Sequence, residues 1–300
     1  MISQYRYYIM QLIQGKETVS NRLNFREMSF IWVMAVALPL PGLYDCCPVF
    51  RYWFKFAVFY CWLMFSSLLM IPLSLLRPGS VENARLGAKL MRPVSALMGI
   101  DWTISGNVDL LNRKEAFVIV CNHQSSVDLL GMFHIWDIVG RMAVIAKQSL
   151  SYYGTFGVTA YLCGTIFIDR TKIEQATAKI NSVGQTLRAN NVKLWVFPEG
   201  TRNRDKTVPL LPFKKGAFHV AHNSGLPILP LGETPLSNQF RSKCLVFAVI
   251  SKHQFLDEQQ RIFLPGSGHI SVLEMVQSQG KTVDQLLEET RNVMLEYLAS

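Results

Sequence analysis

The sequence predicts an α/β fold, a mixed sheet covered by helices, preceded by an N-terminal two-helix membrane segment. Two long charge-free stretches lie before residue 77. From about residue 100, short β-branched runs alternate with stretches of helical period, the pattern of an α/β domain. Half of the 300 residues are hydrophobic and only 17% are charged, so much apolar surface must be buried in a core or a bilayer.

The first charge-free stretch is Met28–Tyr44 and the second is Phe56–Leu76. At the helical rise per residue, the second reaches about 31 Å, enough to cross a bilayer core. The first reaches about 25 Å and contains Pro39 and Pro41. A transmembrane hairpin and a re-entrant or interfacial helix pair both fit. Two buried core helices are disfavoured, because the second stretch has no polar face.

Charge places this region relative to the membrane. Only two cations, Arg51 and Lys55, lie between the two stretches. More cations flank the stretches on the outer sides: Arg6, Lys16, Arg22 and Arg26 before the first, and Arg77, Arg85, Lys89 and Arg92 after the second. The positive-inside rule then puts both ends in the cytosol. We divide the chain into a cytosolic segment (1–27), a two-helix membrane region with a basic linker (28–95) and an α/β domain (96–300).

The net charge of +9 favours an anionic partner, such as an anionic lipid surface or a phosphorylated substrate. Nucleic acid is disfavoured, because the chain has no zinc-finger spacing, long basic run or RNA-binding aromatic motif. No metal site is expected either. His219 and His222 are suitably spaced on a predicted helix but have no evident third ligand.

Residues 100–300 predict strands and helices in alternation. The strands are Trp102–Ser105, Ala116–Cys121, Ala143–Ala146, Thr165–Ile168, Lys193–Phe197, Ile228–Leu231, Leu245–Ile250 and Ile270–Leu273. The helices are Val127–Asp137, Lys172–Ala189, Lys214–Asn223 and Val283–Leu298, the last entered by a capping box formed by Thr282 and Gln285.

The strongest chemical motif follows the strand Ala116–Cys121. Asn122 and His123 leave the strand, and Asp128 follows at the start of the next helix. The carboxyl ends of strands are the usual site position in open α/β sheets. A carboxylate on one ring nitrogen of a histidine leaves the other nitrogen free to accept a proton. The alternative is that Asp128 only caps its helix, because Ser125-x-x-Asp128 is also a helix-start signature.

Three further motifs also follow or form strands. Lys193–Arg202 ends in a turn containing Gly200, and Arg202 offers donors suited to phosphate, although a solvated surface turn is the plainer interpretation. Gly164–Arg170 ends in an Asp-Arg pair that alone suggests only a salt bridge. Leu226–Leu231 has two prolines, which argue against a central strand and for an edge strand or the wall of an acyl groove.

These four blocks in this order resemble the glycerolipid acyltransferase family, specifically eukaryotic, endoplasmic-reticulum 1-acyl-sn-glycerol-3-phosphate (lysophosphatidic acid) acyltransferases. The family pattern N-H-x-x-x-x-D is met by Asn122, His123 and Asp128, and its F-P-E-G-T-R block by Phe197 to Arg202. One departure is the stretch Gly232–Lys243, which looks interposed after the two-proline strand. No nucleophile elbow, Walker loop or H-E-x-x-H motif competes.

The resemblance implies transfer of an acyl group from acyl-CoA, a co-substrate, to the sn-2 hydroxyl of lysophosphatidic acid at the bilayer. The product is phosphatidic acid, for phospholipid and triacylglycerol synthesis, and no cofactor is expected. His123 is the implied general base and Asp128 its partner. The implied substrate-binding residues are Asn122, Lys147, Arg170, Glu199, Gly200, Thr201 and Arg202, and the acyl-groove residues are Pro227 and Pro230.

Two alternatives stay open from the sequence. One is a sister acyltransferase that uses glycerol 3-phosphate or another lysophospholipid as acceptor. The other is a non-catalytic membrane protein that binds lipid with the same fold. The presence of His123, Asp128 and Arg202 argues against the second alternative.

Overall fold

The computed structural model describes residues 39–169, 182–205, 207–235 and 255–299 of the chain. These residues fall into two compact units, one formed by residues up to 55 with 258–263, and the other by 56–257 with 264–300. The first unit contains α2 (Pro39–Cys46), the start of α3 (Pro48–Ser74) and β8 (Ile262–Phe263). Within it, the Arg261 guanidinium lies over the Trp53 ring, 5.7 Å from its centroid.

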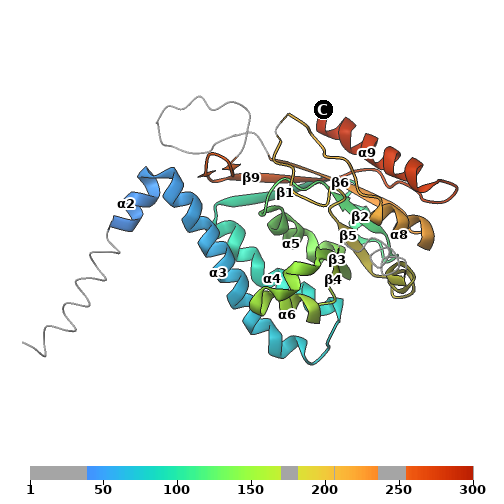
Figure 1. The fold of residues 1–300 in the computed structure, drawn as a ribbon, viewed down its shortest axis with the longest axis horizontal. Coiled ribbons are helices and arrows are strands. Elements are labelled where there is room, and N and C mark those ends of the chain that lie inside the picture. Colours follow the sequence, from blue (N-terminus) through green and yellow to red (C-terminus); the bar gives the residue numbers. More distant parts are fainter. Residues whose placement is uncertain (1–38, 170–181, 206, 236–254, 300) are drawn as a thin grey trace, which may run out of the picture. The chain divides into compact units, whose positions relative to one another are not determined.

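The second unit is built on a seven-stranded sheet (Figure 1). From one edge to the other the strands are β1 (Ile100–Gly106), β9 (Gly266–Val272), β6 (Ile228–Pro235), β2 (Val118–Cys121), β5 (Lys193–Val196), β3 (Met142–Lys147) and β4 (Ile166–Ile168). The last five run parallel, whereas β9 is antiparallel to β6 and parallel to β1. The predicted mixed sheet is therefore confirmed.

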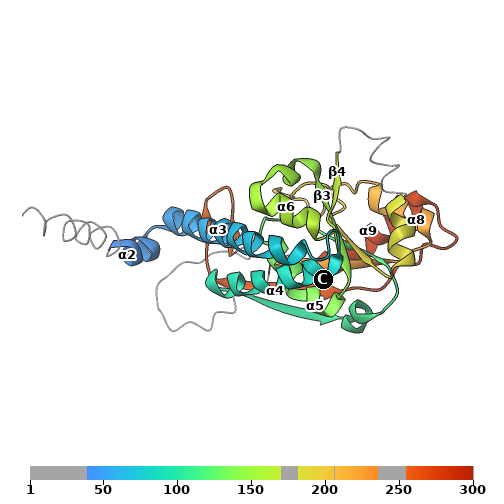
Figure 2. The ribbon, with the colours of Figure 1, turned by 90° about the horizontal axis from the view of Figure 1, so that it is seen from below.

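Helices cover both faces of this sheet, because the central strands are apolar on both sides. Val118, Val120 and Leu194 belong to a core shared with α8 (Gly216–Ser224) and α9 (Val283–Ala299). Phe117, Ile119, Trp195 and Leu229 belong to the opposite core, shared with α4 (Val81–Leu97) and α5 (Asp128–Val139). Figure 2 shows α4 and α5 together, apart from α8 and α9. Burial on both faces is the reason that these strands read as continuous hydrophobic runs.

The remaining elements of the described chain are short: 3₁₀ turns at Val108–Asn112 (η1) and Gln148–Tyr152 (η2), α6 (Gly154–Leu162), a helix over residues 182–189, and β7 (Leu256–Asp257). The predicted capping box of α9 is confirmed, since Thr282 N–H donates to Gln285 Oε1 at 2.9 Å and Gln285 N–H to Thr282 Oγ1 at 3.3 Å. The helices α4 and α6 were not predicted. The predicted strand Leu245–Ile250, most of Gly232–Lys243 and residues 172–181 lie outside the described residues.

One strand prediction is wrong. The two-proline strand β6 is central, between β2 and β9, and not at an edge. Ile228 exchanges two backbone hydrogen bonds with Val276, on the side away from β2. Because successive amides alternate sides along a strand, the nitrogen of Pro230 faces that same side and removes no donor from the ladder with β2. Pro227 precedes the strand, and its oxygen accepts from Val118 N–H at 2.9 Å.

The second charge-free stretch forms most of α3, which starts earlier than predicted, at Pro48, and contains Pro72. Among the described residues, α3 is the one helix long and apolar enough to cross a membrane. The first stretch, Met28–Tyr44, is described only from Pro39 onward. The two-helix membrane segment therefore stays a prediction.

Candidate active site

Most of the predicted site residues gather at the carboxyl ends of the parallel strands. Asn122 and His123 follow β2, and the Phe197–Arg202 turn follows β5. Because β2 and β5 are adjacent and parallel, these two loops are neighbours. Lys147 is the last residue of β3, on the far side of β5, and is exposed. Arg170 lies outside the described residues.

His123 and Asp128 form a hydrogen-bonded pair. The Nδ1 atom of His123 lies 2.8 Å from Asp128 Oδ2, and both side chains are largely shielded from solvent. A carboxylate cannot donate, so a neutral ring in this contact carries its proton on Nδ1. The other nitrogen, Nε2, is then the atom that can accept a proton from a substrate.

Asp128 also organises the loop that carries the histidine. Its Oδ2 accepts the backbone N–H groups of Gln124 at 2.7 Å and Ser125 at 2.9 Å, and its Oδ1 accepts the Ser125 hydroxyl at 3.0 Å. The carboxylate therefore reaches back to the loop in the manner of a capping box. The side chain of Asp128 therefore both caps the loop and pairs with His123.

Phe197, the first residue after β5, fixes the plane of the His123 ring. The two rings are stacked, with centroids 4.1 Å apart and an interplanar angle of 20°. Phe197 itself rests edge-on against Trp195, which is buried in β5. Stacking on one side and the carboxylate at Nδ1 together leave the imidazole little rotational freedom.

The side chain of Glu199 is buried and links two backbone segments by hydrogen bonds, so it does not face a substrate. Its side chain is only 2% exposed, and its oxygens accept the N–H groups of His123 at 2.8 Å and Leu211 at 2.9 Å. Burial raises the pKa of this carboxyl, while the two accepted amides act in the opposite direction. The expectation that Glu199 binds substrate is corrected accordingly: it positions the backbone of His123.

Glu199→Gln is expected to lower the melting temperature of the protein. Glutamine has only one acceptor oxygen, so either the His123 or the Leu211 amide would face an NH₂ group and lose its partner. One unsatisfied buried donor costs about 1–3 kcal/mol, which corresponds to roughly 2–12 °C for a domain of this size. Differential scanning fluorimetry checks this, with Glu288→Gln, at an exposed position on α9, as the control. Equal melting temperatures for the two variants would show that the two hydrogen bonds of Glu199 are dispensable.

Arg202 is tied to the histidine loop. Its Nη1 donates to the Ser126 hydroxyl at 2.6 Å, three residues after His123. Gly200 makes the turn possible, with a positive φ of 71° that other residues rarely adopt. The backbone N–H of Asn203 donates to the His123 oxygen at 2.7 Å, which joins the two loops a second time. Thr201, between these residues, is exposed at the same edge.

The two other groups of predicted residues are placed less favourably. The side chain of Asn122 is fully buried, so it supports the loop from inside and is not available to a substrate. Pro230 is buried within β6 and Pro227 is half-buried before it. Sequence reasoning missed Ser126 and Phe197 as members of the site, although Phe197 begins one of the motifs.

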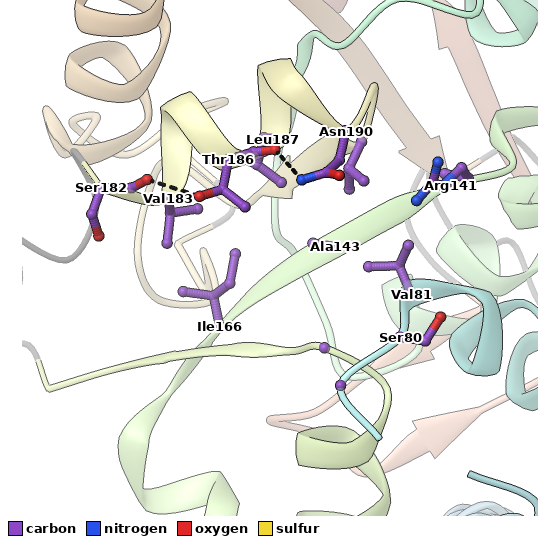
Figure 3. Close-up of a pocket in the computed structure, with 13 residues that line it drawn as sticks. Ser80, Val81, Arg141, Ala143, Ile166, Ser182, Val183, Thr186, Leu187 and Asn190 are labelled. Atoms are coloured by element: carbon purple, nitrogen blue, oxygen red, sulfur yellow. Dashed lines mark hydrogen bonds between the residues drawn. The ribbon is translucent and has the colours of Figure 1, made fainter. Parts of the chain in front are cut away.

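The described residues contain a separate pocket of about 360 Å³ near the amino ends of the strands, away from the candidate site (Figure 3). Val81, Ala143, Ile166 and Val183 face it, from the start of α4, from β3 and β4 and from the helix over residues 182–189. Arg141, which also lines the pocket, directly precedes β3, so the pocket lies at the amino ends of the strands. None of the predicted site residues lines this pocket. In the described part of the chain, no group of three His, Cys, Asp or Glu residues could hold a metal ion.

Comparison with known proteins decides the family. Residues 104–233 match the family model described as Acyltransferase. The human 1-acyl-sn-glycerol-3-phosphate acyltransferase alpha is 36% identical over 260 residues, which cover 85% of this chain and 84% of the human protein. The chain belongs to the 1-acyl-sn-glycerol-3-phosphate acyltransferase family. The human beta enzyme is 31% identical over 226 residues, or 74% of each chain.

This acyltransferase also shares its fold with a solved relative. The crystal structure of the 1-acyl-sn-glycerophosphate acyltransferase PlsC from Thermotoga maritima aligns with a TM-score of 0.58 at 19% identity. The alignment covers 83% of this acyltransferase and 96% of PlsC, so the likeness includes nearly the whole solved chain. The acyltransferase match at residues 104–233 contains both loops of the candidate active site.

Proposed function

We propose that this acyltransferase moves an acyl group from acyl-CoA to the sn-2 hydroxyl of 1-acyl-sn-glycerol 3-phosphate, giving phosphatidic acid and free CoA. The observation that carries the proposal is the 2.8 Å contact between His123 and Asp128, in a loop that also holds Arg202 through Ser126. The human alpha and beta relatives carry the name 1-acyl-sn-glycerol-3-phosphate acyltransferase, which supports the acceptor in this proposal.

In this proposal His123 is the general base. Its Nε2 takes the proton of the glycerol hydroxyl as the oxygen attacks the thioester carbonyl carbon. The carbon–sulfur bond then breaks, and the imidazolium returns the proton to the departing CoA thiolate. Asp128 stabilises the imidazolium through Nδ1 and keeps the ring oriented. No covalent intermediate and no cofactor is needed, since two positioned substrates and a base supply the catalysis.

Arg202 is the proposed contact for the phosphate of the lysolipid. A planar guanidinium offers paired N–H donors that match phosphate oxygens. Its bond to Ser126 places this cation beside the loop of the base. Gly200 and Thr201 shape the turn. Lys147, the last residue of β3, is a further proposed cation for the phosphate or for CoA, as is Arg170, which lies outside the described residues.

The test of this function is an acceptor panel with the purified protein in phospholipid vesicles. Free thiol is measured after adding acyl-CoA with lysophosphatidic acid, glycerol 3-phosphate or lysophosphatidylcholine. Release with lysophosphatidic acid at a much higher kcat/KM than with the others supports the proposal. Preference for another acceptor would reassign the enzyme within its family, and no release with any acceptor would leave only a lipid-binding role.

We also propose that α3 anchors the protein in the endoplasmic reticulum membrane with the α/β domain in the cytosol. The support is the apolar length of α3 and the cations on its flanks. Protease added to sealed microsomes is expected to digest residues 96–300, with a lumenal protein as the protected control. Digestion only after detergent is added would reverse this orientation.

A further inference from the structure

The segment formed by η2 and α6 has a surface unlike that of a soluble protein. No residue from Gln148 to Ile168 is charged. Tyr152 is 80% exposed and Tyr161 69%, and Tyr153 and Val158 are exposed as well. Val158 and Tyr161 are three residues apart in α6, so they lie on one helix face. A surface helix normally turns charged or polar side chains outward, and this one does not.

The polar groups of α6 point the opposite way, into the protein. The Thr155 hydroxyl donates to the Met64 oxygen at 3.0 Å, and the Thr159 hydroxyl donates to the Ser67 oxygen at 2.7 Å. Both acceptors are backbone carbonyls of α3. The helix therefore satisfies its hydroxyls against α3 and leaves apolar and aromatic side chains outside.

The helix α6 lies beside α3, which also exposes apolar side chains. The two hydrogen bonds place the helices side by side, as Figure 1 also shows. Over residues 56–74, the exposed large side chains of α3 are Tyr60, Phe65, Leu68, Leu69 and Leu73. Exposed apolar side chains on two adjacent helices exceed the scattered hydrophobic residues that monomeric soluble proteins expose.

We propose that the η2–α6 surface is a second membrane contact, with Tyr152, Tyr153 and Tyr161 at the boundary between lipid headgroups and acyl chains. Tyrosine is favoured there, because its ring is apolar and its hydroxyl can remain hydrated. With nine residues, α6 reaches only about 14 Å and lies in the interface without crossing the bilayer. The contact follows β3 directly, so it brings the sheet edge that carries His123 to the lipid surface. It does not depend on the proposed reaction.

Photocrosslinking in the full-length protein tests this contact without using activity. p-Benzoylphenylalanine replaces Tyr161 in one variant and Tyr152 in a second, both exposed positions that already hold an aromatic ring. The matched control carries the same group at Asn292, an exposed residue of α9. Each protein is placed in phosphatidylcholine vesicles, irradiated and digested, and the peptide masses are measured.

Peptides containing position 161 or 152 are expected to gain the mass of one phospholipid, in at least about tenfold greater yield than the peptide containing position 292. The apolar η2–α6 surface should bind lipid that much more strongly than the exposed face of α9 around position 292. A covalent dimer at position 161 would instead identify a second copy of the chain as the occupant. Either that dimer, or equal lipid yields at 161 and 292, would overturn the proposal.

Discussion

Asp128→Asn is expected to reduce kcat by about four orders of magnitude, as the matching change does in serine-protease triads. Asparagine can place its amide oxygen where Oδ2 now accepts the His123 ring and two backbone N–H groups. Its NH₂ group would then face the Ser125 hydroxyl, which can accept. The loop geometry is kept, but the negative charge that stabilises a protonated His123 is gone.

Stability separates this expectation from a purely capping role of Asp128. Weakening the charge-assisted hydrogen bonds should cost about 1 kcal/mol, so the melting temperature should fall by only roughly 2–4 °C. His123→Ala should be at least as inactive, and the double variant little worse than either, because the two side chains act as one unit. Near-normal turnover in Asp128→Asn would show that the carboxylate serves the loop alone.

Arg202→Lys is expected to raise KM for lysophosphatidic acid by about thirtyfold while kcat changes little. Lysine keeps one positive charge but cannot hold the Ser126 hydroxyl and present a planar pair of donors to phosphate at once. A lost hydrogen bond to a charged group is worth about 2 kcal/mol, which gives this factor. Phosphate is bound alike in the ground and transition states, so the loss appears in KM.

Ser126→Ala is the matched control for this prediction. It keeps the guanidinium and removes only its hydroxyl partner, so a smaller rise in the same KM is expected. Initial rates over a matrix of lysophosphatidic acid and acyl-CoA concentrations measure both constants. A rise confined to the KM for acyl-CoA in Arg202→Lys would assign this cation to CoA instead of the lysolipid phosphate.

Much of the fold could be predicted because local signals agreed with tertiary structure. The apolar runs that became β2 and β5 are buried on both faces, and α9 has both a helical period and a capping box. The helix α6 was missed because its outward face is apolar, which removes the alternation that identifies surface helices. The expectation that β6 is an edge strand was wrong, because a proline excludes a central strand only where its nitrogen faces a paired neighbour.

The candidate site was predictable in its chemistry more than in its packing. The spacing of His123 and Asp128 indicated a pair that the structure places in contact. By contrast, sequence spacing gives no information on which way a side chain faces, so Glu199 was assigned to the substrate although it is buried against two backbone amides. The stacking of Phe197 on His123 depends on β2 and β5 being neighbours, which only the strand order reveals.

The central claim is direct acyl transfer with His123 as the base, and one assay tests it most directly. CoA thiol and phosphatidic acid are measured together in vesicles containing the wild-type protein, with and without lysophosphatidic acid, and His123→Ala serves as the blank. We expect equal amounts of both products, release of CoA only when the acceptor is present, and loss of both in the variant. Release of one CoA per protein without acceptor, or unchanged rates in His123→Ala, would contradict the account.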